Sequence, residues 1–127
     1  MVDAVRAAQE AARKAQESLY TGIMTVTEHR KVTDDTSKLT RYEDIRVLDD
    51  QPCRLSFETL KQAISSEPAT TVTQVIKLFL SPDITVRAGS KITVTQDGIT
   101  ADYAYSGIPA VYPTHQEIIL NQFERWA

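Results

Sequence analysis

The chain has 127 residues, of which 42% are hydrophobic and 24% charged, a composition typical of one globular domain. The formal net charge of −3 argues against nucleic-acid binding through a basic excess. The single cysteine, Cys53, excludes an intrachain disulfide, and no apolar run reaches the roughly 20 residues of a membrane helix.

Residues 3–20 are expected to form an α-helix. Asp3 is a candidate N-cap, and good helix formers follow without Gly or Pro as far as Gly22. The apolar side chains recur every three or four residues, at Val5, Ala8, Ala12, Ala15 and Leu19. Because alanines bury little area, two alternatives stay open: the helix packs closely on a sheet of its own chain, or it docks on another subunit.

After Gly22 the pattern changes to the two-residue period of β-strands. Residues 23–32 and 39–48 predict a hairpin around a turn-rich stretch, with Val32 opposite Leu39. That register opposes like charges, Glu28 to Glu43 and Arg30 to Arg41. Since like charges directly opposite are unfavourable, we expect the outer half of this hairpin to project into solvent or toward a partner.

The middle of the chain is less regular. Residues 49–52 are expected to break the sheet before a third strand that begins at Cys53, which we expect to be a buried small hydrophobe. Residues 59–64 are a candidate helical turn within a long polar loop at 58–71. Residues 72–80 are apolar on both faces, which favours a central or an interface strand.

The last third contains the sharpest local signal. After a short strand at Ile84 and Val86, Asp97-Gly98 is the preferred pair for a type I′ turn. A two-residue turn fixes the register, so we expect these opposite pairs: Gln96 with Ile99, Thr95 with Thr100, Val94 with Ala101, Thr93 with Asp102, and Ile92 with Tyr103. A bend at 106–109 and a strand at about 115–123 follow.

One helix and seven or eight short strands predict a mainly β protein. We expect a small antiparallel barrel or rolled sheet at 22–127 with an N-terminal helix at 3–20, forming a single domain over 1–127. The sequence offers no catalytic, cofactor or metal constellation: His29 and His115 are isolated, and the carboxylates lie in turns or beside basic residues. We therefore expect a protein that is not an enzyme.

Several runs of the sequence resemble a known family of small virion proteins. The runs are residues 48–57 (LDDQPCRLSF), 77–83 (KLFLSPD), 89–98 (GSKITVTQDG), 109–112 (PAVY) and 115–118 (HQEI). They are similar to head-completion, or stopper, proteins encoded in the head–tail joining region of phages and prophages of Gram-positive bacteria. The Ala-rich start followed by Tyr20-Thr21-Gly22 agrees with this resemblance.

The resemblance implies a ring of copies beneath the portal and its adaptor ring, which closes the DNA channel after packaging and gives the tail a platform. By analogy, the 58–71 loop is the candidate channel plug, with Ser65, Ser66, Glu67 and Pro68 at its centre. The helix and the tip of the first hairpin are candidates for contacts with neighbouring rings. The candidate interface residues are Leu19, Tyr20, Arg30, Arg41, Phe79 and Trp126.

The implied partners are portal or adaptor and tail proteins, sister copies, and packaged DNA approached without sequence-specific binding. The implied location is the virion, after synthesis in the host cytoplasm and without a membrane or a cofactor. A second hypothesis, from a different class, is a small ligand- or peptide-binding β-barrel of bacterial origin that uses the Tyr-rich end.

Overall fold

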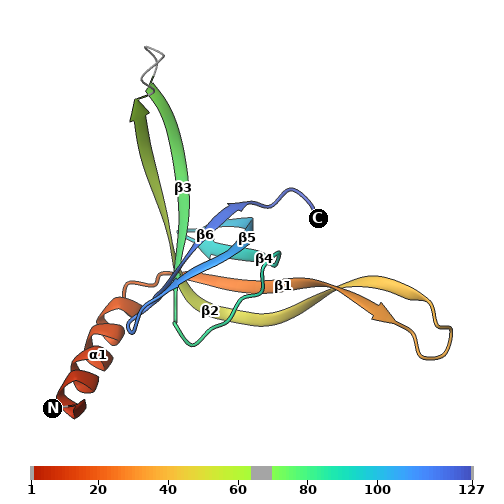
Figure 1. Cartoon of the computed structure of the whole chain (residues 1–127), viewed down its shortest axis with the longest axis horizontal. Coiled ribbons are helices and arrows are strands. Elements are labelled where there is room, and N and C mark those ends of the chain that lie inside the picture. The colour runs from red at the N-terminus through yellow and green to blue at the C-terminus, as the bar shows by residue number, and fades with distance from the viewer. Residues whose placement is uncertain (1, 64–69, 127) are drawn as a thin grey trace.

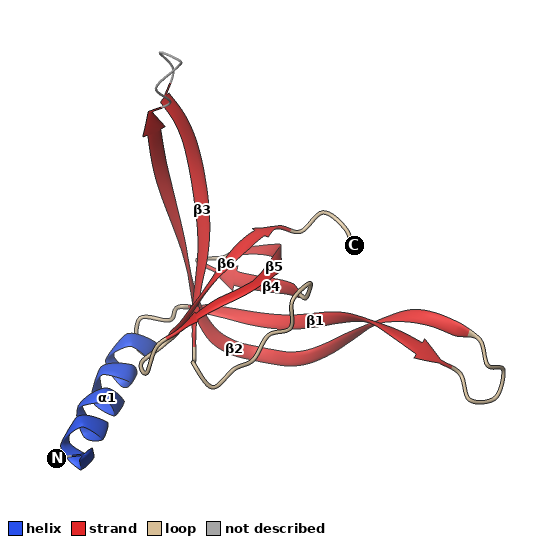
Figure 2. Ribbon diagram, viewed as in Figure 1, coloured by secondary structure: helices blue, strands red, loops and turns tan. Residues whose placement is uncertain are grey.

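The computed structural model describes residues 2–63 and 70–126. It contains a helix α1 and six strands, and the strands close into an antiparallel barrel in the order β1-β2-β3-β6-β5-β4 (Figure 2). The elements are α1 (Val2–Glu17), β1 (Gly22–Thr33), β2 (Thr40–Ala63), β3 (Thr70–Leu80), β4 (Lys91–Gln96), β5 (Ile99–Val111) and β6 (Gln116–Gln122). The expected fold class is confirmed, and α1 is not long and apolar enough to cross a membrane.

Side chains at alternate positions along the strands fill the interior of the barrel. The side chains that point inward include Met24, Leu78, Leu80, Ile92 and Ile118, all of them fully buried. Their neighbours along each strand point outward, as the two-residue period of a strand requires. The inward faces of all six strands therefore form one hydrophobic core, which occupies the interior of the barrel.

The strands are fewer and longer than expected, because two segments expected to break the sheet are bulges. β2 runs through residues 49–52, with Asp50 in the left-handed region at φ 48°. The partners of Met24, Val26 and Thr27 on β2 are Gln51, Leu48 and Arg46, so β2 contains two extra residues there. β5 likewise continues past 106–109, with a register shift between Tyr105 and Pro109. A bulge bends and twists a strand without ending it.

Two other expected elements are wrong. Residues 59–63 extend β2 as a strand instead of forming a helical turn. Residues 84–86 belong to a loop, in which Val86 is buried against the core. The buried Gln116 amide holds this loop, since its Nε2 donates to the carbonyl oxygens of Ile84 at 2.7 Å and Ser81 at 3.2 Å. The loop carbonyls are thus satisfied without a sheet partner.

The first hairpin has a different register from the expected one. Its connection has the expected length of six residues but lies one residue further along the chain, because Thr33 pairs with Thr40 and the Asp34 N–H donates to the Leu39 carbonyl at 2.9 Å. Shifting the pairing by two residues places Arg30 opposite Glu43 and Glu28 opposite Ile45. The expected like-charge repulsion is absent, yet the outer half of the hairpin does project from the barrel (Figure 1).

The Asp97-Gly98 hairpin has the expected register at every pair from Gln96–Ile99 to Ile92–Tyr103. Both turn residues have positive φ, 52° at Asp97 and 78° at Gly98, as a type I′ turn requires.

Replacing Gly98 by valine should lower the free energy of unfolding by about 1–3 kcal/mol, because a β-branched residue is strained at positive φ. A Cβ at this position would meet no atom within 4 Å, so steric clash does not contribute. Chemical denaturation measures the loss, and Gly98→Asn is the matched control, since asparagine tolerates this conformation. Equal stability of Gly98→Val and wild type would contradict the turn assignment.

Candidate interaction surfaces

Three projections leave the barrel in different directions (Figure 1). The first is α1. The second is the β1–β2 arm, residues 28–45, which begins where β4 stops pairing with β1 at Thr27. The third is the β2–β3 arm, residues 58–63 and 70–75, which begins where β6 stops pairing with β3 at Ile76. Each arm extends beyond the packed core and offers surface for contacts with other molecules.

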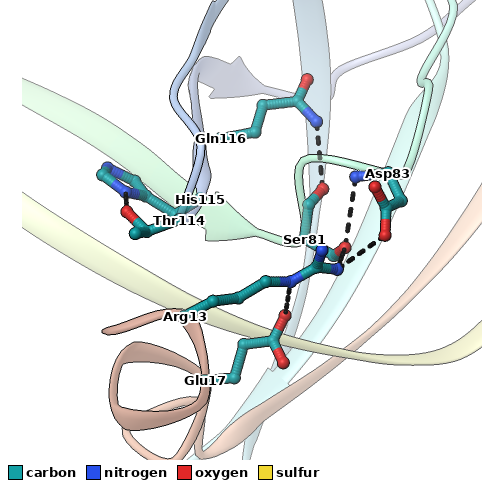
Figure 3. Close-up of polar contacts among 7 residues, drawn as sticks. All are labelled: Arg13, Glu17, Ser81, Asp83, Thr114, His115 and Gln116. Carbon is teal, nitrogen blue, oxygen red and sulfur yellow. Dashed lines mark hydrogen bonds and ion pairs between the residues drawn. The ribbon is translucent and has the colours of Figure 1, made fainter. Parts of the chain in front are cut away.

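Arg13 joins helix α1 to the barrel (Figure 3). Arg13 donates from Nη2 to Ser81 Oγ and to Asp83 Oδ2, both at 2.7 Å, and from Nε to Glu17 at 3.0 Å. The bonds to Asp83, and then to Glu17, raise the pKa of the Arg13 guanidinium. Since the Asp83 N–H also bonds to Ser81 Oγ at 3.2 Å, the loop presents an ordered acceptor pair to the helix.

The apolar stripe of α1 faces solvent. Val5 is 58% exposed and Leu19 is 57% exposed, and the alanines between them are exposed as well. Close packing of this face on the chain's own sheet is therefore wrong, which leaves docking on another subunit as the remaining prediction. Asp3 lies in the first turn and not at the N-cap, because the helix begins at Val2.

The segment after α1 forms a small pocket against the barrel. Tyr20 lines a cavity of about 210 Å³ together with Glu17, Gln51, Pro52, Ser81 and Ile84. Its hydroxyl is buried and has no hydrogen-bond partner among the described residues, and burial raises the pKa of the phenol. Leu19 and Tyr20 thus lie in different settings: one side chain is exposed, whereas the other lines a cavity at the root of the helix.

The two arginines proposed for an interface lie on one face of the β1–β2 arm, in separate ion pairs. Arg30 bonds the largely buried Glu28 at 2.7 Å, and Arg41 bonds Glu43 through Nε at 2.8 Å. Each pair joins residues two apart on one strand, and in the register Arg30 also faces Glu43. The alternating charges stabilise this face of the arm only modestly, because most of these groups are exposed.

The opposite face of the arm contains an aromatic stack. The His29 ring lies between Tyr42, at a centroid distance of 4.8 Å, and Trp126, at 4.9 Å. His29 Nδ1 lies 2.8 Å from Asp44 Oδ1, and this hydrogen bond is the main cause that lowers the pKa of Asp44. Phe123 packs edge-on against Trp126 at 5.0 Å. The C-terminal segment thereby holds the root of the arm.

The remaining sites expected from sequence are distributed over the molecule. Phe79 points outward near His115, with ring centroids 5.9 Å apart, and His115 stacks on Tyr112 at 4.8 Å. Ser65, Ser66, Glu67 and Pro68 lie outside the described residues. His29 and His115 belong to different aromatic clusters, and no group of three His, Cys, Asp or Glu side chains in the described ranges is placed to hold a metal ion.

Sequence reasoning missed two contacts that define these surfaces. The bond from Arg13 to Asp83 joins residues 70 positions apart, and only the Arg13–Glu17 spacing of four was visible in the sequence. The bond from His29 to Asp44 depends on the hairpin register, and the observed register differs from the expected one by two residues. Charge pairing could have identified this register from the sequence, because the observed register places more oppositely charged residues opposite each other than the expected register does.

No family model and no curated protein matches the chain. Among solved structures, the phage-like element PBSX protein xkdH from Bacillus subtilis aligns with a TM-score of 0.49 and 15% sequence identity, over 79% of this chain and 91% of that one. Similarity this low does not establish a shared function.

Replacing Arg13 by alanine should release α1 from the barrel while leaving the barrel folded. The pairs are partly exposed, so the expected loss of global stability is at most about 1 kcal/mol. Backbone heteronuclear NOE values across α1 should fall clearly, whereas those of the strands stay unchanged. Arg6→Ala is the control, since Arg6 has no ion pair among the described residues. A helix as rigid as in wild type would contradict the role of Arg13.

The Cys53 thiol should be unreactive in the folded protein. Its side chain is fully buried, and desolvation raises the pKa of the thiol to about 12, so the reactive thiolate is scarce at pH 8. Alkylation followed by mass spectrometry should detect label only after denaturation. Rapid labelling under native conditions would show that the barrel opens at β2.

Proposed function

We propose that this protein is a structural, non-catalytic subunit of the head–tail joint of a tailed phage or prophage, with a head-completion (stopper) role. The observation that supports this most is architectural: a small, filled barrel from which α1 and two hairpin arms project, with exposed apolar side chains on α1 and on the β1–β2 arm. An assembly subunit needs such surplus surfaces, whereas an isolated globule does not. The resemblance of five sequence runs to stopper proteins gives the more specific role.

A ring of identical subunits needs two different surfaces on each copy, because its interface is heterologous and closes by rotation. The exposed stripe of α1 is one candidate surface. The outward side of β3, β5 and β6 is a candidate for the other, since Ile108 and Ile119 are exposed there and line a shallow groove with Lys77, Pro109, Ala110 and Glu117. Weak individual contacts suffice, since many copies act together.

The β2–β3 arm is proposed as the element that reaches the DNA channel. Beyond the last pairing with β6, residues 70–75 of β3 continue in a two-stranded ribbon with β2. At about 3.3 Å per residue, the described part of this ribbon ends roughly 20 Å from the barrel. The proposed plug residues Ser65, Ser66, Glu67 and Pro68 lie in the sequence between its two strands, outside the described residues. The net charge of −3 suits a channel wall that DNA passes without binding.

The proposed partners are the portal or adaptor ring on one side, tail proteins on the other, and sister copies around the ring. The proposed location is the virion, after synthesis in the host cytoplasm.

The alternative, a barrel that binds a small ligand in its interior, is disfavoured by packing. Met24, Leu78, Ile92 and Ile118 are fully buried and occupy the space that a ligand would need. The filled interior does not bear on a peptide that binds to the outside of the sheet.

The direct test uses phage heads assembled without this protein. Adding the purified chain should retain packaged DNA and allow tails to attach, and electron microscopy should show a ring of density below the portal. Heads that hold DNA and accept tails without the protein would contradict the proposal.

A pair of matched variants tests the role of α1 within this proposal. Ala12→Glu places a charge on the exposed apolar stripe and should reduce tail attachment at least about tenfold, because a buried unpaired charge is costly. Ala7→Glu makes the same change on another side of the same helix and should leave attachment within about twofold of wild type. Equal effects of the two variants would exclude α1 as the docking element.

A further inference from the structure

The β1–β2 arm has an open edge beside a pocket. Pairing between β4 and β1 stops at Lys91 opposite Thr27, while β1 itself continues to Thr33. The chain leaves this edge at Ser90, where residues 87–90 form a tight turn with Gly89 at φ 81° and a 3.2 Å bond from the Ser90 N–H to the Arg87 carbonyl. The place that β4 would occupy beside residues 29–33 is therefore not filled by any described strand.

The registers show which backbone groups point to that edge. The two-residue turn at Asp97-Gly98 makes Gln96–Ile99 a hydrogen-bonded pair, so alternate β4 residues, Lys91 among them, direct their N–H and C=O groups to β1. The backbone N–H and C=O groups of Thr27, opposite Lys91, therefore point to β4. By alternation, the backbone groups of His29, Lys31 and Thr33 point to the same side of β1.

The far end of the hairpin gives the same assignment independently. The Asp34 N–H donates to the Leu39 carbonyl at 2.9 Å, so the even-numbered residues of the arm, Arg30 and Val32 among them, point to β2. The extra residues of the bulges lie on β2, which leaves the alternation of β1 undisturbed. A row of strand-type donors and acceptors is thus presented outward.

The space beside this edge is preformed. A pocket of about 400 Å³ lies between residues 28–31 and the turn at 87–90. The turn is fixed by two backbone bonds to β5, from the Gly89 N–H to the Tyr105 carbonyl at 3.0 Å and from the Tyr105 N–H to the Ser90 carbonyl at 3.1 Å. Ser90 is 2% exposed, and its buried hydroxyl has no partner among the described residues.

The charges around the pocket are mainly positive. Arg30, Lys31 and Arg87 line it, and the one carboxylate, Glu28, is engaged by Arg30 at 2.7 Å. Arg87 also lies 3.6 Å from Glu28 but is 73% exposed at its side chain. Lysine and arginine along an open edge hinder pairing with basic or neutral strands. An acidic strand is the class of chain that these charges attract.

The other open edge of the sheet is partly occupied. β2 has no β1 partner beyond Cys53, but there the Gln96 side chain bonds the outward-pointing backbone N–H and carbonyl of Leu55. Gln96 Oε1 accepts from the Leu55 N–H at 2.8 Å, and its Nε2 donates to the Leu55 carbonyl at 3.3 Å. The β1 edge has no such substitute among the described contacts.

We infer that the β1 edge at residues 29–33 binds an extended, acidic segment of a partner protein, which adds to the sheet as a strand in the position that β4 vacates at Ser90. Main-chain hydrogen bonds to His29, Lys31 and Thr33 supply affinity, and contacts with Lys31 and Arg87 select acidic side chains. This binding is a property of the isolated chain and does not depend on the proposed place in a phage neck.

Hydrogen exchange by NMR tests the inference with a capped peptide of alternating glutamate and valine. In the free protein the amides of His29, Lys31 and Thr33 should exchange fast, and those of Arg30 and Val32 slowly. The acidic peptide should protect the first three, and a lysine–valine peptide of equal length should not. Absence of protection by the acidic peptide, or equal protection by both peptides, would overturn the inference.

Two variants at one position separate backbone pairing from charge. Lys31→Pro removes an edge N–H without removing a β1–β2 bond and should weaken binding roughly tenfold or more. Lys31→Val keeps the N–H and should bind within about threefold of wild type. Retained protection of Arg30 and Val32 verifies that the proline variant keeps its hairpin.

The double variant Lys31→Glu, Arg87→Glu keeps every backbone N–H and C=O group. It therefore tests the selectivity for acidic side chains even if the proline variant loses its hairpin. Its preference should invert toward the lysine–valine peptide. Unchanged binding by Lys31→Pro with its hairpin intact, or an unchanged preference in the double variant, would contradict strand addition at this edge.

Discussion

Barrel closure with strands longer than the barrel is the constraint on which the rest of the structure depends. Six strands pair in a closed cycle, and this leaves no open edge within the barrel itself. β1, β2 and β3 continue past the closed part, so their surplus length emerges as two-stranded arms. β2 supplies one strand to both arms, and the bulge near Asp50 turns it from the first direction into the second. The arms are therefore extensions of core strands, which fixes their starting directions.

The sequence predicts the parts of this fold that local chemistry decides. The Asp97-Gly98 turn specifies its own register because both residues must adopt positive φ, and the inward residues of β3 and β4 follow from simple alternation. The helix follows from residue propensity and its uninterrupted length. Together these signals predict the mainly β fold class and the N-terminal helix.

The sequence misleads where a turn-forming run has two possible uses. Asp49-Asp50-Gln51-Pro52 and Ser106-Gly107-Ile108-Pro109 have the composition of loops, yet both lie in strands as bulges. Whether such a run ends a strand or bends it depends on a partner strand far away in the sequence, which local composition does not contain. The first hairpin shows the same limit, because a connection displaced by one residue along the chain changes the partner of every β1 residue in the arm by two. The contacts of Arg13 and Gln116 with the 81–84 loop join residues far apart in the sequence, so the periodicity of the sequence does not predict them.

The lone tryptophan has a consequence for studying assembly. Trp126 is the chain's only indole, and its ring stacks on His29 at the root of the β1–β2 arm while Lys91 lies 5.6 Å from its centroid. All tryptophan emission from this protein therefore originates at the junction between the barrel, the C-terminal segment and that arm. A partner that re-angles the arm or lifts the C-terminus must alter the surroundings of that single fluorophore. The molecule thus contains its own optical sensor for movement at this joint, without any added label.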